Sequence, residues 1–283
     1  MYWLFISVFL YASNNILWKI FIKEEQPLRL INRRAVFTVL IAFTAIWVTQ
    51  FDIMTYIQNP KAVYVFLGSL FGVAGLVLMV TFLKKGGLVR MGYYSLMGTF
   101  IAAAYTYLFK EVPFSNKTLI GAILIITGYM VFLLNEKRQA KSESALFSQH
   151  MLLIGMTICF AISLLIQWEC LKIFPPIAII ATQEVTVLTV TFIALMLLNV
   201  NAPNQVKGIV TIRNTAFMAI VIFVAIFTGT LGLKTADPFL ASITGISVPV
   251  LTVFGGSMMF KDKLNILYVI SLVLMILGGL ELL

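Results

Sequence analysis

The chain has 283 residues, of which 61% are hydrophobic and 11% charged, and its mean hydropathy is +1.02. This small number of charged residues cannot cover the surface of a water-soluble globule of this size. The composition therefore predicts a membrane protein. The net charge of +9 would suggest nucleic acid as the partner of a soluble protein. Here most Lys and Arg residues lie at the ends of apolar runs, where topology and lipid headgroups explain them, and we expect no nucleic-acid partner.

Ten apolar runs are long enough to cross a bilayer, which takes about 20 residues per helix. They cover residues 2–22, 30–50, 62–83, 88–109, 115–134, 151–171, 176–198, 215–235, 239–260 and 264–283. Their continuous Leu, Ile and Phe content favours helices over alternating strands. The first run lacks a basic start and a cleavage pattern, so we expect a retained helix and no signal peptide.

The second half of the chain repeats short motifs of the first. Residues 109–111 (Phe-Lys-Glu) correspond to residues 260–262 (Phe-Lys-Asp), and residues 19–21 correspond to 172–174, both Lys-Ile-Phe. Self-similarity over hydrophobic segments is typical of transporters built from two structural repeats.

The strongly polar stretch 135–149 separates the two expected repeats, 1–134 and 150–283. Five helices on each side of it force the second repeat to enter the membrane from the opposite face. We therefore predict an all-α membrane protein with ten transmembrane helices arranged as two inverted five-helix repeats.

Basic residues are unevenly divided between the two faces. Fifteen lie around the connections that follow odd-numbered helices and five around the others. By the positive-inside rule, this distribution places both termini outside. We expect a multi-pass protein of the cell membrane, with a bacterial inner membrane as its location.

Features near the repeat boundaries resemble those of the drug/metabolite transporter superfamily, specifically its EamA-like ten-helix members. They are a polar patch in the first helix, Arg33 and Arg34 near the start of the second, and an acidic residue before each glycine-bearing closing helix. Lys110 and Lys261 depart from the glycine usual in that family before the acidic residue.

The resemblance implies a secondary transporter in which helices five and ten are peripheral and the other helices line the cavity. Export is the more frequent direction in the family. Its members are generally drawn with both termini in the cytoplasm, so the orientation remains open.

Polar side chains at membrane depth are the candidate substrate-binding residues, because they are expensive there unless they serve function or hydrogen-bond between helices. Glu184, next to Gln183, could bind a cation, accept a proton or form a structural ion pair. Asn14, Asn15 and Trp18 in the first helix correspond by repeat to the region of Gln167 in the sixth.

Two further groups of residues in the first and sixth helices have a competing interpretation. Trp18, Trp168, Lys19 and Lys172 could be interfacial anchors and snorkelling cations, an interpretation favoured for Trp168, Glu169 and both lysines.

The fourth and ninth helices carry further candidates at comparable depth. Tyr93 and Tyr94 lie ahead of Gly98, while Thr244 lies ahead of Pro249. A mid-helix proline frees a carbonyl one turn earlier, so Pro249 and Gly98 are expected to mark kinks beside the pathway. Packing alone also explains such kinks.

The sequence contains no catalytic, metal-ligand or phosphate-loop pattern, so we expect no enzyme activity, no metal and no cofactor. The function predicted is transport of a small metabolite such as an amino acid, or of an amphipathic drug-like compound, with a coupling proton or cation as a further partner. The alternatives are a membrane scaffold or sensor and a flippase of lipid-linked substrates.

Overall fold

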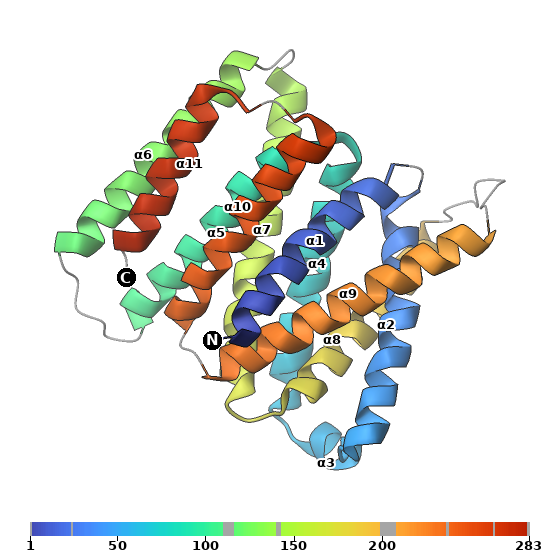
Figure 1. Ribbon diagram of the computed structural model, residues 1–283. Coiled ribbons are helices and arrows are strands. Elements are labelled where there is room, and N and C mark those ends of the chain that lie inside the picture. The colour runs from blue at the N-terminus through green and yellow to red at the C-terminus, as the bar shows by residue number, and fades with distance from the viewer. Residues whose placement is uncertain are drawn as a thin grey trace.

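The computed structural model describes residues 2–23, 25–109, 116–139, 143–198, 208–235, 238–262 and 264–281. Within these residues the chain is helical and contains no strand (Figure 1). The helices are α1 (Tyr2–Phe21), α2 (Pro27–Thr49), α3 (Ile53–Gln58), α4 (Ala62–Lys85), α5 (Leu88–Phe109), α6 (Asn116–Gln139), α7 (Glu143–Leu171), α8 (Pro176–Leu197), α9 (Gly208–Thr235), α10 (Pro238–Phe260) and α11 (Ile266–Glu281).

Seven helices in the described part of the chain are long and apolar enough to cross a membrane: α1, α2, α4, α6, α7, α8 and α9. Residues 245–260 of α10 and 266–281 of α11 form shorter apolar helices. The all-helical, multi-pass character predicted from composition is therefore confirmed.

The short helix α3 was not predicted, because six residues are too few to give a hydrophobic period. Asp52 caps its start by accepting hydrogen bonds from the backbone N–H groups of Met54 and Thr55. The Thr55 hydroxyl also donates to this carboxylate, and these hydrogen bonds, led by that from the hydroxyl, hold the pKa of Asp52 below its ordinary value.

The polar stretch 135–149 is helical at both ends, since α6 continues to Gln139 and α7 begins at Glu143. Asn135 and Glu136 are buried despite their polarity. Their hydrogen-bond partners, described below, explain why the helix continues here. Residues 140–142 lie outside the described part.

The main helix pairs each join one helix of the first half to one of the second. They are α1 with α9, α2 with α8, α4 with α7, α5 with α10, and α6 with α11. Figure 1 shows α6 and α11 side by side at one edge of the molecule, with α2 and α3 at the opposite edge.

The glycines of α4 form the face that packs against α7. A Cβ atom at Gly68 would lie 2.9 Å from Ile166, and one at Gly75 would lie 2.8 Å from the ring of Phe160. This face of α4 is therefore a close helix–helix contact of the kind that small residues allow in membranes.

One end of the molecule, called the basic end below, carries the last turns of α1, α4, α6, α8 and α10 and the first turns of α2, α5, α7, α9 and α11. It lies along the upper side of Figure 1. Fifteen basic residues were assigned to the connections between these turns from the sequence, but Arg34, one of them, is buried inside α2 with an exposed fraction of 2%. The count of fifteen basic residues therefore includes at least one, Arg34, that does not belong to a connection.

Candidate functional site

A buried ion pair joins the two halves of the chain between α2 and α8. Arg34 Nη2 lies 2.9 Å from Glu184 Oε2, and the exposed fractions of the two side chains are 2% and 1%. The hydroxyl of Thr38, one turn after Arg34 on α2, donates to the same carboxylate oxygen at 2.6 Å. Glu184 thus has the ion-pair partner that the sequence left as one of its alternatives.

The pair lies well inside the helices that carry it. Arg34 and Glu184 are each about 11 to 12 Å from the start of their helices, at 1.5 Å per residue in helices about 33 Å long. Figure 1 shows α2 and α8 running in opposite directions. The two side chains therefore meet across the middle of the apolar length.

One face of α1 completes this cluster. Trp18 is fully buried, and the Arg34 guanidinium lies 5.8 Å from the centre of its ring. Asn14, one turn earlier, is also buried, and Tyr11 lies within electrostatic range of Glu184. The spacing of these three residues places them on one helix face. We call Tyr11, Asn14, Trp18, Arg34, Thr38 and Glu184 the Arg34–Glu184 cluster.

Several polar atoms of this cluster have no hydrogen-bond partner among the described residues. Two are acceptors, Glu184 Oε1 and Asn14 Oδ1, and two belong to donors, Arg34 Nε and Trp18 Nε1. Buried polar atoms are normally paired, so this concentration of unpaired atoms needs an explanation. It leaves capacity for a water molecule or a polar ligand.

Gln167 of α7 lies against Gln183 of α8, the residue that precedes Glu184 in the chain. The Gln167 side-chain amide donates to Gln183 Oε1 at 3.1 Å and to the Ser163 hydroxyl at 3.3 Å. Asn15 faces another neighbour, because its amide donates to Thr252 on α10 at 3.1 Å. The structure therefore spreads the amide candidates over two helix contacts.

Tyr93 and Tyr94 lie on the side of α5 that faces α6, α7 and α11. Tyr93 stacks on Phe132 with ring centres 4.5 Å apart and donates a hydrogen bond to the backbone carbonyl of Tyr268. Tyr94 shares a hydrogen bond with His150 Nδ1. The contacts of Tyr93 with Phe132 and Tyr268, and of Tyr94 with His150, lie outside the Arg34–Glu184 cluster.

A second buried carboxylate, Glu136 of α6, anchors the polar residues near these tyrosines. Its exposed fraction is 1%, its Oε2 lies 2.5 Å from Arg90 Nε, and its Oε1 accepts a hydrogen bond from the Tyr268 hydroxyl. Asn135 and Asn265 exchange amide hydrogen bonds beside it. Oε1 thus has a hydrogen bond, whereas Oε2 has the ion-pair contact with Arg90 but no hydrogen bond among the described residues. Both oxygens contact side chains of the protein, which is the pattern of a structural network.

The remaining candidates are helix-packing positions or lie outside the description. Pro249 is inside α10, and a Cβ at Gly92 of α5 would lie 3.0 Å from its carbonyl oxygen. Gly98 faces α7, where the nearest atom to an added Cβ is 3.7 Å away, on Thr157. Thr244 lies in α10, but its side chain is outside the described part of the chain. A role of Gly98 or Pro249 beside a pathway stays a prediction.

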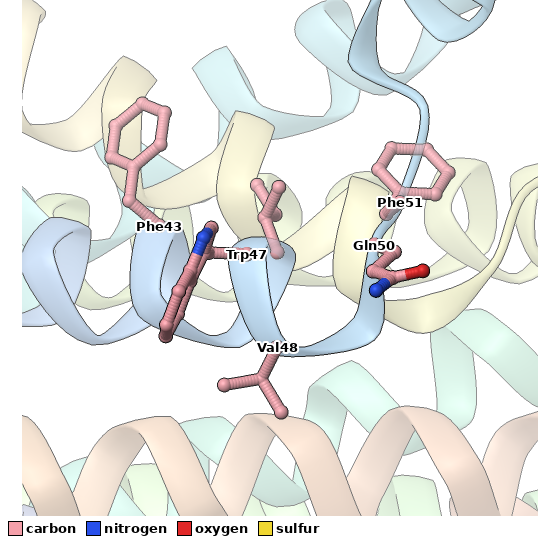
Figure 2. A pocket seen from close by; sticks show the side chains of 6 residues that line it. Phe43, Trp47, Val48, Gln50 and Phe51 are labelled. Carbon is pink, nitrogen blue, oxygen red and sulfur yellow. The ribbon is translucent and has the colours of Figure 1, made fainter.

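A hollow at the end of α2 is lined mainly by apolar side chains together with Gln50. It has a volume of about 670 Å³ and is lined by residues 43, 46–48, 50 and 51. Figure 2 shows that its labelled side chains, among them Phe43, Trp47 and Val48, point in different directions around the helix end. Trp47 is 79% exposed. This surface suits lipid contact and contains no charged group.

Arg34 and Thr38 were missed as members of the Arg34–Glu184 cluster, and Arg90 and Glu136 were missed as members of the second network. A signal for the first was present in the sequence: Arg34 and Glu184 are 150 positions apart, close to the spacing of the repeat motifs. Charged residues at corresponding depths of corresponding helices could have been read as partners. Arg90 and Glu136 gave no such signal, because they lie at the ends of apolar runs.

Comparisons with known proteins give one family and one fold. The model of the EamA-like transporter family matches residues 1–134. A crystal structure described only as that of a protein has a TM-score of 0.71 and 13% sequence identity, covering 99% of this chain and 94% of its own. At this identity the likeness shows the fold alone. The comparison with curated proteins finds no match.

Proposed function

Because its first half, residues 1–134, belongs to the EamA-like transporter family of the drug/metabolite transporter superfamily, we propose that the protein is a secondary transporter. The proposed substrate is a small metabolite such as an amino acid, or an amphipathic drug-like compound, and the proposed direction is export. The mechanism is alternating access between two inverted five-helix repeats.

The pattern of helix pairs supports the inverted repeats. If the halves correspond, α1 matches α7, α2 matches α8, α4 matches α9, α5 matches α10 and α6 matches α11. Exchanging the halves then converts the α1–α9 contact into the α4–α7 contact, and leaves the α2–α8, α5–α10 and α6–α11 contacts unchanged. A two-fold axis in the membrane plane produces this self-mapping set.

The observation that carries the proposal is the Arg34–Glu184 pair. It joins corresponding helices of the two halves, which is where repeat transporters bind substrate. Buried charges inside a membrane protein mark pathways and relays more often than they add stability. The pair also lies among the unpaired atoms of Asn14 and Trp18.

These atoms suggest how the site works. A substrate that carries a hydrogen-bond donor would bind Glu184 Oε1 and Asn14 Oδ1, and one that carries an acceptor would bind Arg34 Nε and Trp18 Nε1. Rocking of the halves would open the cluster to one face and then to the other. A coupling proton or cation would act at Glu184, because protonation or cation binding there weakens its attraction for Arg34.

A thermal-shift screen of the purified protein tests the site. Amino acids, nucleosides, sugars and cationic dyes are the probes, and a ligand at 100 times its dissociation constant stabilises the folded state by about 2.7 kcal/mol. We expect a hit whose shift is lost in Glu184→Gln and kept in Glu136→Gln, an equally buried glutamate in the other network. A hit with equal shifts in both variants would place the site elsewhere.

A further inference from the structure

Lys19, in the last turn of α1, binds the end of another helix. Its Nζ atom donates to the carbonyl oxygens of Leu83 at 2.8 Å and of Gly86 at 2.5 Å. The last carbonyls of a helix have no partner within it and carry partial negative charge, so a lysine there is favourable. Lys19 thereby ties α1 to the turn between α4 and α5.

Asp262, from the second half of the chain, binds the other side of the same turn. Its Oδ2 atom accepts a hydrogen bond from the backbone N–H of Val89 at 3.3 Å. A Cβ atom at Gly87 would lie only 2.7 Å from this oxygen, so the carboxylate approaches the backbone closely. Asp262 also attracts the charge of Lys19. The turn is therefore held between residues of both halves at the basic end.

Lys172 is the repeat counterpart of Lys19 and makes contacts of another kind. Its Nζ pairs with Glu169 at 2.6 Å and lies 3.9 Å from the centre of the Trp168 ring. Both partners come from the last turn of α7, directly before Lys172, and the lysine side chain is 50% exposed. It borders a hollow of about 420 Å³ that Cys170 also lines. The ion pair and the ring contact of Lys172 are therefore within its own segment.

We propose that Lys19 is a latch that closes the basic end, and that Lys172 is its counterpart at the opposite end, engaged only when the transporter reverses. This inference rests on the alternating access of the proposed function. The structure then has the Lys19 latch closed and the Lys172 latch open. The repeat gives the two lysines equivalent positions, and their different contacts are what two alternating latches require in one conformation.

A simple helix cap is the competing explanation for Lys19. A cap stabilises the helix end in every conformation, so its removal loosens the protein without favouring one state. A latch stabilises only the state in which it is closed, so its removal shifts the population toward the other state. The two explanations therefore differ in what happens at the opposite end of the molecule.

Two cysteine reporters measure both ends. Val89→Cys, in a background with Cys159→Ser and Cys170→Ser, reports on the basic end, because Val89 is buried and lines the hollow of about 260 Å³ beside Asp262. Native Cys170, in a Cys159→Ser background, reports on the opposite end. The rate of reaction with a water-soluble maleimide is measured in each.

We expect Lys19→Met to accelerate labelling of the Val89→Cys reporter about tenfold, the effect of losing a charge-assisted hydrogen bond, and to slow labelling of Cys170. Lys19→Arg keeps the cation and should leave both rates near the parent values. Lys23→Met is the matched control, because Lys23 is exposed and lies over the Phe260 ring, 5.3 Å from its centre. It should change neither rate.

Acceleration at both ends, or no change at either, would overturn the latch. If Lys19→Met does not fold, Asp262→Asn gives the same test by weakening the other side of the turn. The readout does not need flux, so a protein that transports none of the probes can still show reciprocal labelling. Conversely, flux without reciprocity would reject the latch and leave the transporter standing.

Discussion

The Arg34–Glu184 pair predicts a characteristic pattern of destabilisation when its members are removed singly and together. At 2.9 Å, and with an effective dielectric constant of about 20, the attraction is about 6 kcal/mol before desolvation is subtracted. Removing one partner leaves a buried charge unpaired, which typically destabilises by roughly 3–5 kcal/mol. Arg34→Met and Glu184→Leu should each have an effect of this size.

The double variant should recover most of the loss. With both charges replaced by apolar groups of similar volume no buried charge remains, and such replacements are often neutral. Thr38 keeps hydrogen bonds to carbonyls of its own helix. We therefore expect Arg34→Met with Glu184→Leu to be more stable than either single variant.

The assay is thermal unfolding of the protein in detergent, with the midpoint followed by intrinsic fluorescence. At about 2 °C per kcal/mol for a chain of this size, each single variant should unfold about 6–10 °C lower than the parent protein. Arg33→Met is the matched control, because the neighbouring Arg33–Glu25 pair is partly exposed and such pairs contribute about 0–1 kcal/mol. Losses in the double variant equal to the sum of the singles would refute the reasoning.

Three further predictions concern packing, the second network and pH. Gly75→Leu should lower the midpoint, because even a Cβ there meets a ring of α7 at 2.8 Å, whereas Gly98→Ala, with 3.7 Å of room, should not. Tyr268→Phe should destabilise the protein by about 1.5–3 kcal/mol, because Glu136 loses the hydrogen bond donated by the Tyr268 hydroxyl. The same unfolding assay measures this, and an unchanged midpoint would contradict the hydrogen bond. Asp52→Ala should lower the midpoint at pH 7, and the difference should shrink as the pH falls through the lowered pKa of Asp52. Because the pKa of Asp52 is lowered in the folded protein, its contribution to the free energy of unfolding is present above the unfolded-state pKa and is lost as the carboxylate is protonated. A difference in midpoint that persists in acid would argue against the cap.

The fold was largely readable from the sequence because apolar length alone sets membrane-spanning helices. Runs such as 62–83 and 176–198 agree with α4 and α8 to within about two residues at each end. The sequence did not show that α6 continues into the polar stretch 135–149, because tertiary partners, above all Arg90 and Tyr268 for Glu136, override local polarity. The division of the chain at this stretch stays a prediction. The ten-helix inverted repeat stays a prediction.

The candidate site was predicted only in part. The position of a residue along an apolar run indicates its depth in the membrane, but the sequence gives a weaker signal for the direction in which its side chain points around the helix. Glu184 and Asn14 were selected by depth and Trp18 by its repeat-related position, and the structure brings the three to one place. Tyr93 and Tyr94 lie at a plausible depth but on another face of their helix. Whether any of these residues binds substrate stays a prediction.

Flux in proteoliposomes tests the central claim most directly. The substrate is a compound identified by thermal shift, and counterflow is compared between the parent protein, Glu184→Gln and Glu136→Gln, with protein amounts matched. The account predicts flux in the parent protein and in Glu136→Gln, and none in Glu184→Gln. Equal flux in Glu184→Gln and the parent protein would contradict it, because the buried pair between the halves would then have no part in transport.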